Sequence, residues 1–263
     1  MIRLFLIGII AVLMLQYTTG EAKTTSEFYQ EGEELTYEVS YFGIKLGSIK
    51  VYSKKKMDLG GREVYNVECE MKTYSGIPFV DLHAIFEGWT DRSFSYSRKF
   101  IGRTKESDTS WSYQKISYDY DKGEIEQMKW INKVLIDSSK FESKKKWNDG
   151  ISLFFLARKY AKRSKSYKIP TIINDDTCYT TINFRNKIED VEIDAVDYPV
   201  NTVYFDGLAD WEGVYGVTGI FEGWFSNDEA SVPIMAKMKV IVGKVKIELI
   251  EWKRKGWSPP KKS

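Results

Sequence analysis

Alternation of apolar and polar residues is clearest at the end of the chain. From residue 234 to 242 the apolar positions fall on one face of a strand, and these are Ile234, Ala236, Met238, Val240 and Val242. Gly243 permits a tight reversal, after which Val245, Ile247 and Leu249 alternate with charged residues. The pattern predicts a closing antiparallel hairpin. Because a lone hairpin is marginally stable in water, its apolar face needs an earlier sheet to pack against.

The same period of two recurs along most of the chain. It predicts strands at residues 35–41, 48–54, 62–74, 79–90, 94–105, 111–120, 124–131, 167–173, 177–184, 187–196 and 200–205. Turn residues separate them, most clearly Asp121-Lys122-Gly123, and we interpret the glycines between residues 207 and 223 as turns or bulges. The predicted fold is mainly β, a curved antiparallel sheet or partly closed barrel.

One segment follows a helical period instead. Asn148 or Asp149 can cap a helix that begins near Gly150, and the apolar residues from Ile151 to Ala161 recur every three to four positions. Basic residues at its end complement the helix dipole. The sequence therefore predicts one α-helix packed on the sheet.

The first residues have the character of an export signal. Arg3 precedes an apolar run from Leu4 to Leu15, which is shorter than the roughly 20 residues that span a bilayer. We expect residues 1–22 to be a signal peptide, with an uncleaved amphipathic or anchoring segment as the alternative. Residues 23–255 are expected to form a single β-rich envelope domain, and residues 256–263 a loose tail. No integral membrane span is predicted after removal of the signal.

Charge is almost balanced, with 39 Lys and Arg against 37 Asp and Glu. A nucleic-acid-binding surface needs a lopsided or clustered charge, so no nucleic-acid partner is expected. The runs Lys54–Lys56 and Lys144–Lys146 are predicted to lie in solvated loops, which leaves peripheral association with the envelope open. Lysines opposite the core of the closing hairpin argue against an integral outer-membrane barrel.

Two cysteines, Cys69 and Cys178, occur in a chain predicted to reach an oxidising compartment. Each is in phase with apolar neighbours, which favours buried free thiols. A disulfide between them is the alternative, because the sequence does not reveal whether their Cβ atoms are close enough.

Candidate catalytic residues are few. His83 is the only histidine, and no nucleophile motif accompanies it. Three carboxylate pairs could in principle serve glycoside hydrolysis, namely Asp175 with Asp176, Asp206 with Asp210, and Asp228 with Glu229. Each pair lies in a predicted turn, where acids are common for local hydrogen bonding. We therefore predict no catalytic residue, no metal site and no cofactor.

Aromatic residues make up 15% of the chain. They suit cross-strand packing, but their faces can also line an apolar pocket or stack on sugars. A Phe-rich helix over the mouth of a curved sheet would enclose such a pocket. The candidates for lining it are Tyr37, Tyr41, Phe154, Phe155 and Trp224.

Several segments resemble an exported bacterial family of unknown function, domain-of-unknown-function family 3108. They are Glu31-Gly32-Glu33-Glu34-Leu35-Thr36-Tyr37 with Tyr41-Phe42-Gly43-Ile44-Lys45-Leu46-Gly47, the helix entry Asp149 to Arg158, and Trp224 to Ile234 running into Ile241 to Val245. The resemblance implies a signal-bearing, mostly β domain of the cell envelope and transfers no activity. The chain has Asn227-Asp228 where the family usually has two aspartates, which argues against a two-carboxylate site there.

These patterns favour a non-catalytic, periplasmic or secreted protein of the cell envelope. It would bind an apolar or envelope-derived ligand, a lipid or a glycan, or a protein partner. One alternative is an enzyme that acts on envelope polysaccharide through paired carboxylates. Another is a structural scaffold with no small ligand.

Overall fold

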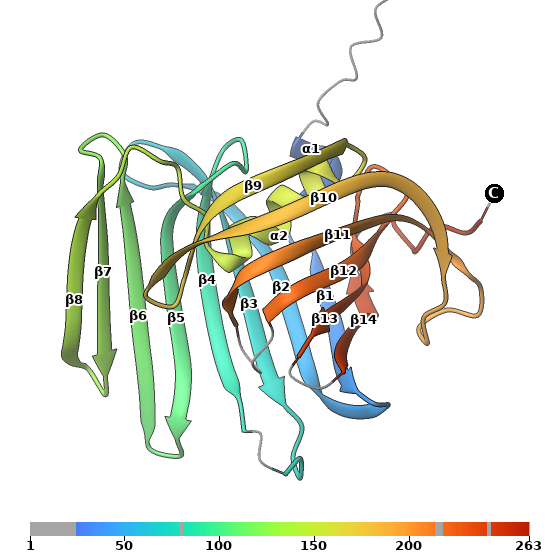
Figure 1. The fold of residues 1–263 in the computed structure, drawn as a ribbon, viewed down its shortest axis with the longest axis horizontal. Helices are drawn as coiled ribbons and strands as arrows, with labels where there is room; N and C mark the ends of the chain where they lie inside the picture. Colours follow the sequence, from blue (N-terminus) through green and yellow to red (C-terminus); the bar gives the residue numbers. More distant parts are fainter. Residues whose placement is uncertain (1–24, 79–80, 214–217, 241–242, 263) are drawn as a thin grey trace, which may run out of the picture.

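The computed structural model describes residues 25–78, 81–213, 218–240 and 243–262. Its strands form one antiparallel sheet of 14 strands, in the order β8-β7-β6-β5-β4-β3-β2-β1-β14-β13-β12-β11-β10-β9. The sheet bends over on itself without closing into a barrel (Figure 1). The predicted fold class, mainly β with a curved antiparallel sheet and a packed helix, is confirmed.

The first half of the chain is a meander in which each strand pairs with the next. Its strands are β1 (Glu34–Tyr41), β2 (Ile44–Asp58), β3 (Glu63–Thr73), β4 (His83–Asp91), β5 (Ser97–Ser107), β6 (Ser110–Asp119), β7 (Glu124–Ile131) and β8 (Val134–Glu142). The turn predicted at Asp121 to Gly123 joins β6 to β7. Strand β8, exposed along almost its whole length, forms one edge of the sheet.

The second half is another meander that folds over the first. Its strands are β9 (Ser164–Ile173), β10 (Asp176–Val191), β11 (Val200–Glu212), β12 (Thr218–Ser226), β13 (Pro233–Lys239) and β14 (Lys244–Lys253). The predicted closing hairpin is β13–β14, and β14 pairs with β1, with Tyr37 opposite Leu249. The strands that come first and last in the chain, β1 and β14, are therefore neighbours in the middle of the sheet.

Helix α2 (Gly150–Tyr160) lies inside the bend, where it contacts β3, β4 and β9 (Figure 1). Asp149 caps its amino terminus and accepts 2.8 Å hydrogen bonds from the backbone N–H groups of Ile151 and Ser152. A short helix, α1 (Thr25–Phe28), packs against α2. Because the sheet curves around α2, the apolar side of the helix and the inner face of the sheet are buried against each other.

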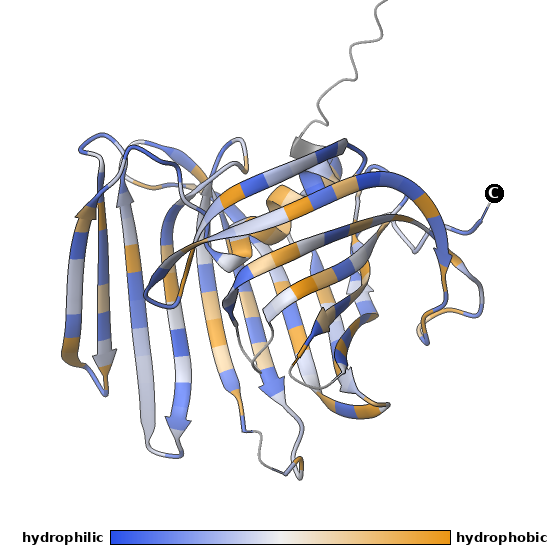
Figure 2. Cartoon of the chain, viewed as in Figure 1, coloured by the Kyte–Doolittle hydropathy of each residue, from blue (hydrophilic) through white to orange (hydrophobic). Residues whose placement is uncertain are grey.

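Side chains along the strands alternate between a buried and an exposed face, which Figure 2 shows as alternating orange and blue. The inner faces of β1 to β3 and of β13 and β14 pack with α1 and α2 in the main core, which includes Leu35, Val67, Phe155, Ile234 and Leu249. A second cluster joins the far side of α2 to β9 to β12. The interior of the bend is thus filled largely by side chains.

Gly207 and Gly223, in the passage predicted to be turns or bulges, lie within regularly paired strands instead. Gly207 is in β11 and Gly223 in β12, and both lie against aromatic rings. A Cβ on Gly207 would lie 2.2 Å from Phe221, and one on Gly223 would lie 2.6 Å from Phe205. These positions require glycine because a neighbouring ring fills the space where a side chain would begin.

Two other segments differ from the sequence prediction. Lys54–Lys56 lies in strand β2, not in a loop, because its backbone continues the pairing with β3 past a register shift. The carboxyl-terminal residues 256–262 are held on the sheet: Asn201 N–H donates to the Pro260 carbonyl at 2.8 Å, and Trp257 packs edge-on against Trp252. These two contacts order a segment that was predicted, from its prolines and lysines, to be a loose tail.

Candidate functional site

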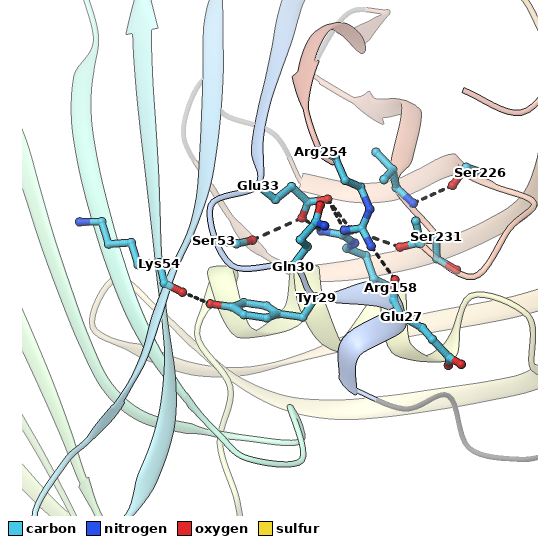
Figure 3. Close-up of polar contacts among 12 residues, drawn as sticks. Glu27, Tyr29, Gln30, Glu33, Ser53, Lys54, Arg158, Ser226, Ser231 and Arg254 are labelled. Atoms are coloured by element: carbon cyan, nitrogen blue, oxygen red, sulfur yellow. Dashed lines mark hydrogen bonds and ion pairs between the residues drawn. The ribbon is translucent and has the colours of Figure 1, made fainter. Parts of the chain in front are cut away.

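A buried ionic cluster of Glu33, Arg158 and Arg254 joins both ends of the domain to the helix (Figure 3). Glu33 precedes β1, Arg158 lies in the last turn of α2, and Arg254 follows β14. Arg158 donates to both oxygens of Glu33, at 2.7 and 2.9 Å, and Arg254 donates to Oε1 at 2.8 Å. The bidentate geometry fixes the helix to the start of the sheet.

This ionic cluster is inaccessible to solvent, with 1% of Glu33 and none of Arg158 exposed. Burial alone would raise the pKa of Glu33, but the charges and hydrogen bonds of Arg158 and then Arg254 outweigh it and lower that pKa below its usual value. The carboxylate is therefore held ionised by two cations. Because no ligand can reach it without unfolding the surrounding segments, the cluster serves structure and not ligand binding.

Neighbouring hydrogen bonds extend this attachment between the two ends of the domain. Arg254 donates to the carbonyl of Glu27 at 2.6 Å, and the side chain of Gln30 accepts from the backbone N–H of Lys255 at 2.9 Å. Figure 3 shows Glu27 and Gln30 beside Arg254. The indole N–H of Trp257 donates to Asp228 at 2.7 Å. The segments before β1 and after β14 are thereby tied to each other.

The accessible candidate site is a groove between the β7–β8 hairpin and the β9–β10 turn. Its volume is about 700 Å³, within the range of ligand sites. Hydroxyl, amide, charged and aromatic side chains line it, and they come from three separate segments: Gln127, Ser139, Phe141, Glu142, Ser143, Lys144, Lys145, Trp147, Asp175, Asp176 and Thr177. We call this site the edge groove.

Register and turn geometry bring the walls of the edge groove together. Gln127 of β7 pairs with Ser139 of β8, so the two side chains lie on the same face of the hairpin. On the opposite wall, Asp175 accepts a 3.0 Å hydrogen bond from Gln114 and lies 3.4 Å from the ammonium of Lys129. These contacts hold the β9–β10 turn over the concave side of β6 and β7.

Trp147 forms the floor of the edge groove. Its indole N–H donates to Ser143 at 2.8 Å, and its backbone N–H and carbonyl both bond to the hydroxyl of Tyr120. The backbone N–H of Ser97 also donates to the Trp147 carbonyl. Together these bonds fix the linker between β8 and α2. The aromatic floor is therefore rigid before any ligand arrives.

One polar atom in the edge groove lacks a partner. Gln127 is buried and its Nε2 reaches the Asp175 carbonyl at 3.4 Å, but its Oε1 has no hydrogen-bond partner among the described residues. A buried acceptor without a donor costs about 1–3 kcal/mol. The groove thus presents three carboxylates, two lysines and two aromatic rings to a ligand, with the buried Gln127 amide beneath them.

A second, more apolar groove of about 490 Å³ lies on the other face of the same hairpins. Its lining includes the aromatic residues Trp111, Tyr113 and Trp130, together with Arg103 and Lys133. Tyr113 and Trp130 are directly opposite each other on β6 and β7, with their rings edge to face. Cross-strand packing accounts for this aromatic contact.

The five residues predicted to line a pocket do not line either groove. Tyr37 and Phe155 are buried in the main core, where Phe154 and Trp224 also pack. Tyr41 lies at the end of β1 with its ring against Phe42. Their role as ligand contacts stays a prediction, and the structure places four of them together around α2 and the sheet.

The carboxylate pairs have separate surroundings. Asp206 accepts from Arg185 and Asn183, whereas Asp228 accepts from Ser226. Of the three pairs, Asp175 and Asp176 line one of the two grooves described, the edge groove, and the other two pairs line neither. His83 contacts Glu70 at 2.9 Å on the outer face of the sheet.

Both cysteines are buried free thiols, so the alternative of a disulfide is not realised. Cys69 lies in β3 and Cys178 in β10. Among residues 25–78, 81–213, 218–240 and 243–262, no group of three or more His, Cys, Asp or Glu side chains is arranged to hold a metal ion.

Sequence reasoning did not identify the ionic cluster or the edge groove. Arg158 interrupts the apolar face of the helix, and a cation at such a position is a signal for a buried carboxylate partner. No comparable signal marks Gln127, whose burial depends on how the β9–β10 turn folds over β7.

A family profile described as "Protein of unknown function (DUF3108)" matches residues 36–250. The chain belongs to the DUF3108 family. This match confirms the resemblance drawn from the opening, helix-entry and closing segments. No curated protein matches the chain.

Two solved structures align with the chain at low sequence identity. A β-barrel-like protein of domain-of-unknown-function family 1849 from Brucella abortus aligns with a TM-score of 0.55 and 10% identity, covering 86% of this chain and 98% of that one. A Bacteroides fragilis protein with a YmcC-like fold aligns with a TM-score of 0.32 and 9% identity, covering 86% and 97%. The first likeness shows that the DUF3108 chain has the same kind of fold. Within the described part of the chain, no helix has the length and apolarity needed to cross a membrane.

Proposed function

We propose that this DUF3108 protein is a non-catalytic binding protein of the cell envelope, periplasmic or secreted, that holds a glycan-type ligand in the edge groove. The observation that carries the proposal is a groove of about 700 Å³ that sets Phe141 and Trp147 beside carboxylates and lysines, over a buried Gln127 whose Oε1 has no partner among the described residues. A rotation of the Gln127 side chain toward the groove would let an N–H or O–H of a sugar supply the missing donor.

The chemistry of the groove favours a glycan over an acyl chain. Sugars present apolar ring faces and many hydroxyl groups, which suit aromatic rings flanked by carboxylates, amides and ammonium groups. Phe141 and Trp147 supply the rings, and Asp176, Lys144 and Lys145 are among the polar groups. The interior of the sheet, where an acyl chain would be expected, is occupied by core side chains.

The cell-envelope location rests on the sequence. The apolar run Leu4–Leu15 behind Arg3 has the form of an export signal, and it lies outside the described residues. The proposal combines that expectation with the groove.

Ser138 and Ser139 of β8 allow a matched test of the binding site. Ser139 lines the groove, whereas Ser138 is its neighbour on an exposed strand and points to the opposite face. Ser139→Trp should fill the groove, and Ser138→Trp adds the same bulk on the other side. Both changes suit a strand, because tryptophan has high β propensity.

Binding of N-acetylglucosamine oligomers, followed by isothermal titration calorimetry, provides the readout. These probes carry acetamido N–H groups that can donate to Gln127. We expect wild-type and Ser138→Trp proteins to bind equally and Ser139→Trp to lose binding. Gln127→Met, which keeps the side-chain volume, should weaken binding up to about tenfold. Equal affinities of the two tryptophan variants, or no binding by the wild type, would refute the proposal for this ligand class.

A second candidate, hydrolysis of an envelope polysaccharide, is supported by the presence of Asp175 and Asp176 in the same groove. Glycosidases use two carboxylates on opposite sides of the scissile bond. Incubation of the protein with the same oligomers and chromatography of the products distinguishes the two functions. Turnover that Asp176→Asn abolishes would establish the hydrolase and overturn the non-catalytic proposal.

A further inference from the structure

Three turns lie side by side at one end of the sheet. The β1–β2 turn contains Phe42 and Gly43, and the β3–β4 turn begins beside it, since Tyr74 N–H donates to the Leu46 carbonyl at 2.9 Å. On the other side, the ring of Phe42 lies 3.0 Å from where a Cβ on Gly243 of the β13–β14 turn would be. Tyr74, Phe42 and Gly243, from these three turns, therefore lie on one surface.

Large apolar side chains project from this surface into solvent. Phe42 is 75% exposed and Ile44 is 60% exposed, and both flank the β1–β2 turn. Tyr74 of the adjacent turn is 37% exposed. Figure 2 shows the apolar colour at the β1–β2 turn, at the lower end of the ribbon. Exposed apolar side chains that gather on one surface mark an interaction site, whereas scattered single ones do not.

The backbone of the β1–β2 turn is also unfavourable for phenylalanine. Phe42 has φ of 46° and Gly43 has φ of 81°, and Tyr41 pairs directly with Ile44, which is the geometry of a two-residue type I′ turn. Asparagine is preferred at the first position because bulky L-residues are strained at positive φ. In the two-residue β7–β8 turn the corresponding position is indeed Asn132, with φ of 46°. Folding therefore does not account for an exposed phenylalanine at residue 42.

Lysines surround these apolar side chains. Lys45 follows Ile44, and Lys239 and Lys244 flank the β13–β14 turn; all three are exposed. Lys45 and Lys244 also form ion pairs with Glu38 and Glu222, at 2.9 and 2.8 Å. We call Phe42, Ile44, Lys45, Tyr74, Lys239 and Lys244 the tip cluster.

The other end of the sheet has a different character. Its β12–β13 connection carries Asp228 and Glu229, and its β2–β3 and β6–β7 turns carry Asp58 and Asp121. Exposed Met57 and Lys56 at the β2–β3 turn lie beside Asp58, so acidic side chains accompany the apolar and basic ones at this end.

We propose that the tip cluster docks the protein on an anionic lipid surface, with Phe42 and Ile44 inserted at the level of the head groups. Isolated side chains on neighbouring hairpin turns can enter a deformable bilayer together, whereas they form no groove for a protein segment. Lysines at the same level would meet lipid phosphates; Lys45 and Lys244, which also pair with Glu38 and Glu222, would add less than the roughly fivefold gain in affinity expected of Lys239. The edge groove, on the β7–β8 hairpin several strands away, would remain open to a ligand.

Sedimentation with large unilamellar vesicles tests the proposal. Vesicles of phosphatidylcholine with about 30 mol % phosphatidylglycerol should bind the protein, and vesicles of phosphatidylcholine alone should bind it much more weakly. Raising the ionic strength should weaken binding, because the lysines are exposed and their attraction to lipid is screened.

Phe42→Asn is the decisive variant, because it places the favoured residue at the first position of the type I′ turn. It should keep or raise the melting temperature while lowering vesicle binding about tenfold or more. Lys239→Gln should lower binding about fivefold without affecting folding. Insertion of residue 42 can also be followed directly, since Phe42→Trp should give a fluorescence blue shift on addition of anionic vesicles.

Val134 of β8 supplies a matched control, since it is 65% exposed on a separate hairpin. Its hairpin lies beyond the β5–β6 turn, where exposed Asp108 would face the lipid phosphates. Val134→Asn should therefore leave vesicle binding unchanged. The proposal is wrong if the wild type fails to bind anionic vesicles, or if Phe42→Asn binds as well as the wild type. Because ligand binding in the edge groove is measured without lipid, the two proposals can fail independently.

Discussion

Replacing Glu33 by glutamine should strongly destabilise the protein. The substitution keeps the size of the side chain and removes its charge, leaving the guanidinium groups of Arg158 and Arg254 without their shared carboxylate. The side chains of both arginines are largely shielded from water, with 0% and 7% exposed. Removing one partner of a buried ion pair costs about 3–5 kcal/mol, because the remaining charge stays desolvated.

This cost is large against a typical stability of about 5–15 kcal/mol. For a domain of this size it corresponds to a fall in melting temperature of about 6–20 °C. The adjacent pair Glu34–Lys253 provides a control on the same two strands, since its side chains are 45% and 74% exposed. Glu34→Gln should cost no more than about 1 kcal/mol, because water screens the exposed pair.

Urea unfolding followed by tryptophan fluorescence measures both variants. Glu33→Gln should lower the urea midpoint with an unchanged slope, and Glu34→Gln should leave the midpoint nearly unchanged. Equal midpoints for the two variants would show that the ionic cluster is open to water or worth no more than a surface pair. That result would refute the structural role assigned to it.

Three further predictions follow from the same interactions. Because the pKa of Glu33 is lowered, the stability advantage of the wild type over Glu33→Gln should be full above the usual pKa of 4.5. It should decline as the pH falls through the lowered pKa. Urea midpoints at a series of pH values measure this. Gly207→Ala should cost about 1–3 kcal/mol of unfolding free energy, since its Cβ would lie 2.3 Å from the Thr181 carbonyl oxygen. Gly150→Ala, whose Cβ would have its nearest contact at 3.6 Å, should be neutral or stabilising. Melting curves of the two variants test this. Burial, with smaller contributions from Glu68 and Glu70, raises the pKa of Cys69 to about 12. Ellman's reagent at pH 8 should therefore label this thiol only after denaturant is added. Rapid labelling of Cys69 in the native protein would contradict its burial.

Local patterns in the sequence were sufficient to predict many of the strands and the helix α2. The period of two from Ile234 to Leu249 predicted the closing hairpin, and Asp149 before an apolar 3.6-residue repeat predicted where α2 begins. These signals are local because a strand or helix exposes one face to water whatever it packs against. That the helix packs on the sheet followed from the same argument, but its place inside the bend did not.

Other features depend on contacts between residues far apart in the chain. Glu33 and Arg158 are separated by 125 positions, and Glu33 and Arg254 by 221. The sequence contained a hint in Arg158, a cation on the apolar face of the helix, but did not specify which carboxylate it meets. Likewise, the sequence predicted turns or bulges at Gly207 and Gly223, because the aromatic rings of Phe221 and Phe205 reach them only through the register of β11 with β12.

The amino-acid sequence by itself determined the alternating strands, the capped helix and the family to which the chain belongs, because each depends on neighbouring residues. Only the tertiary structure decided that Gln127 faces the β9–β10 turn, and that Phe42, Tyr74 and Lys244 share one surface. Those placements depend on how antiparallel strands align and how the sheet bends, and both are set by packing across the whole domain.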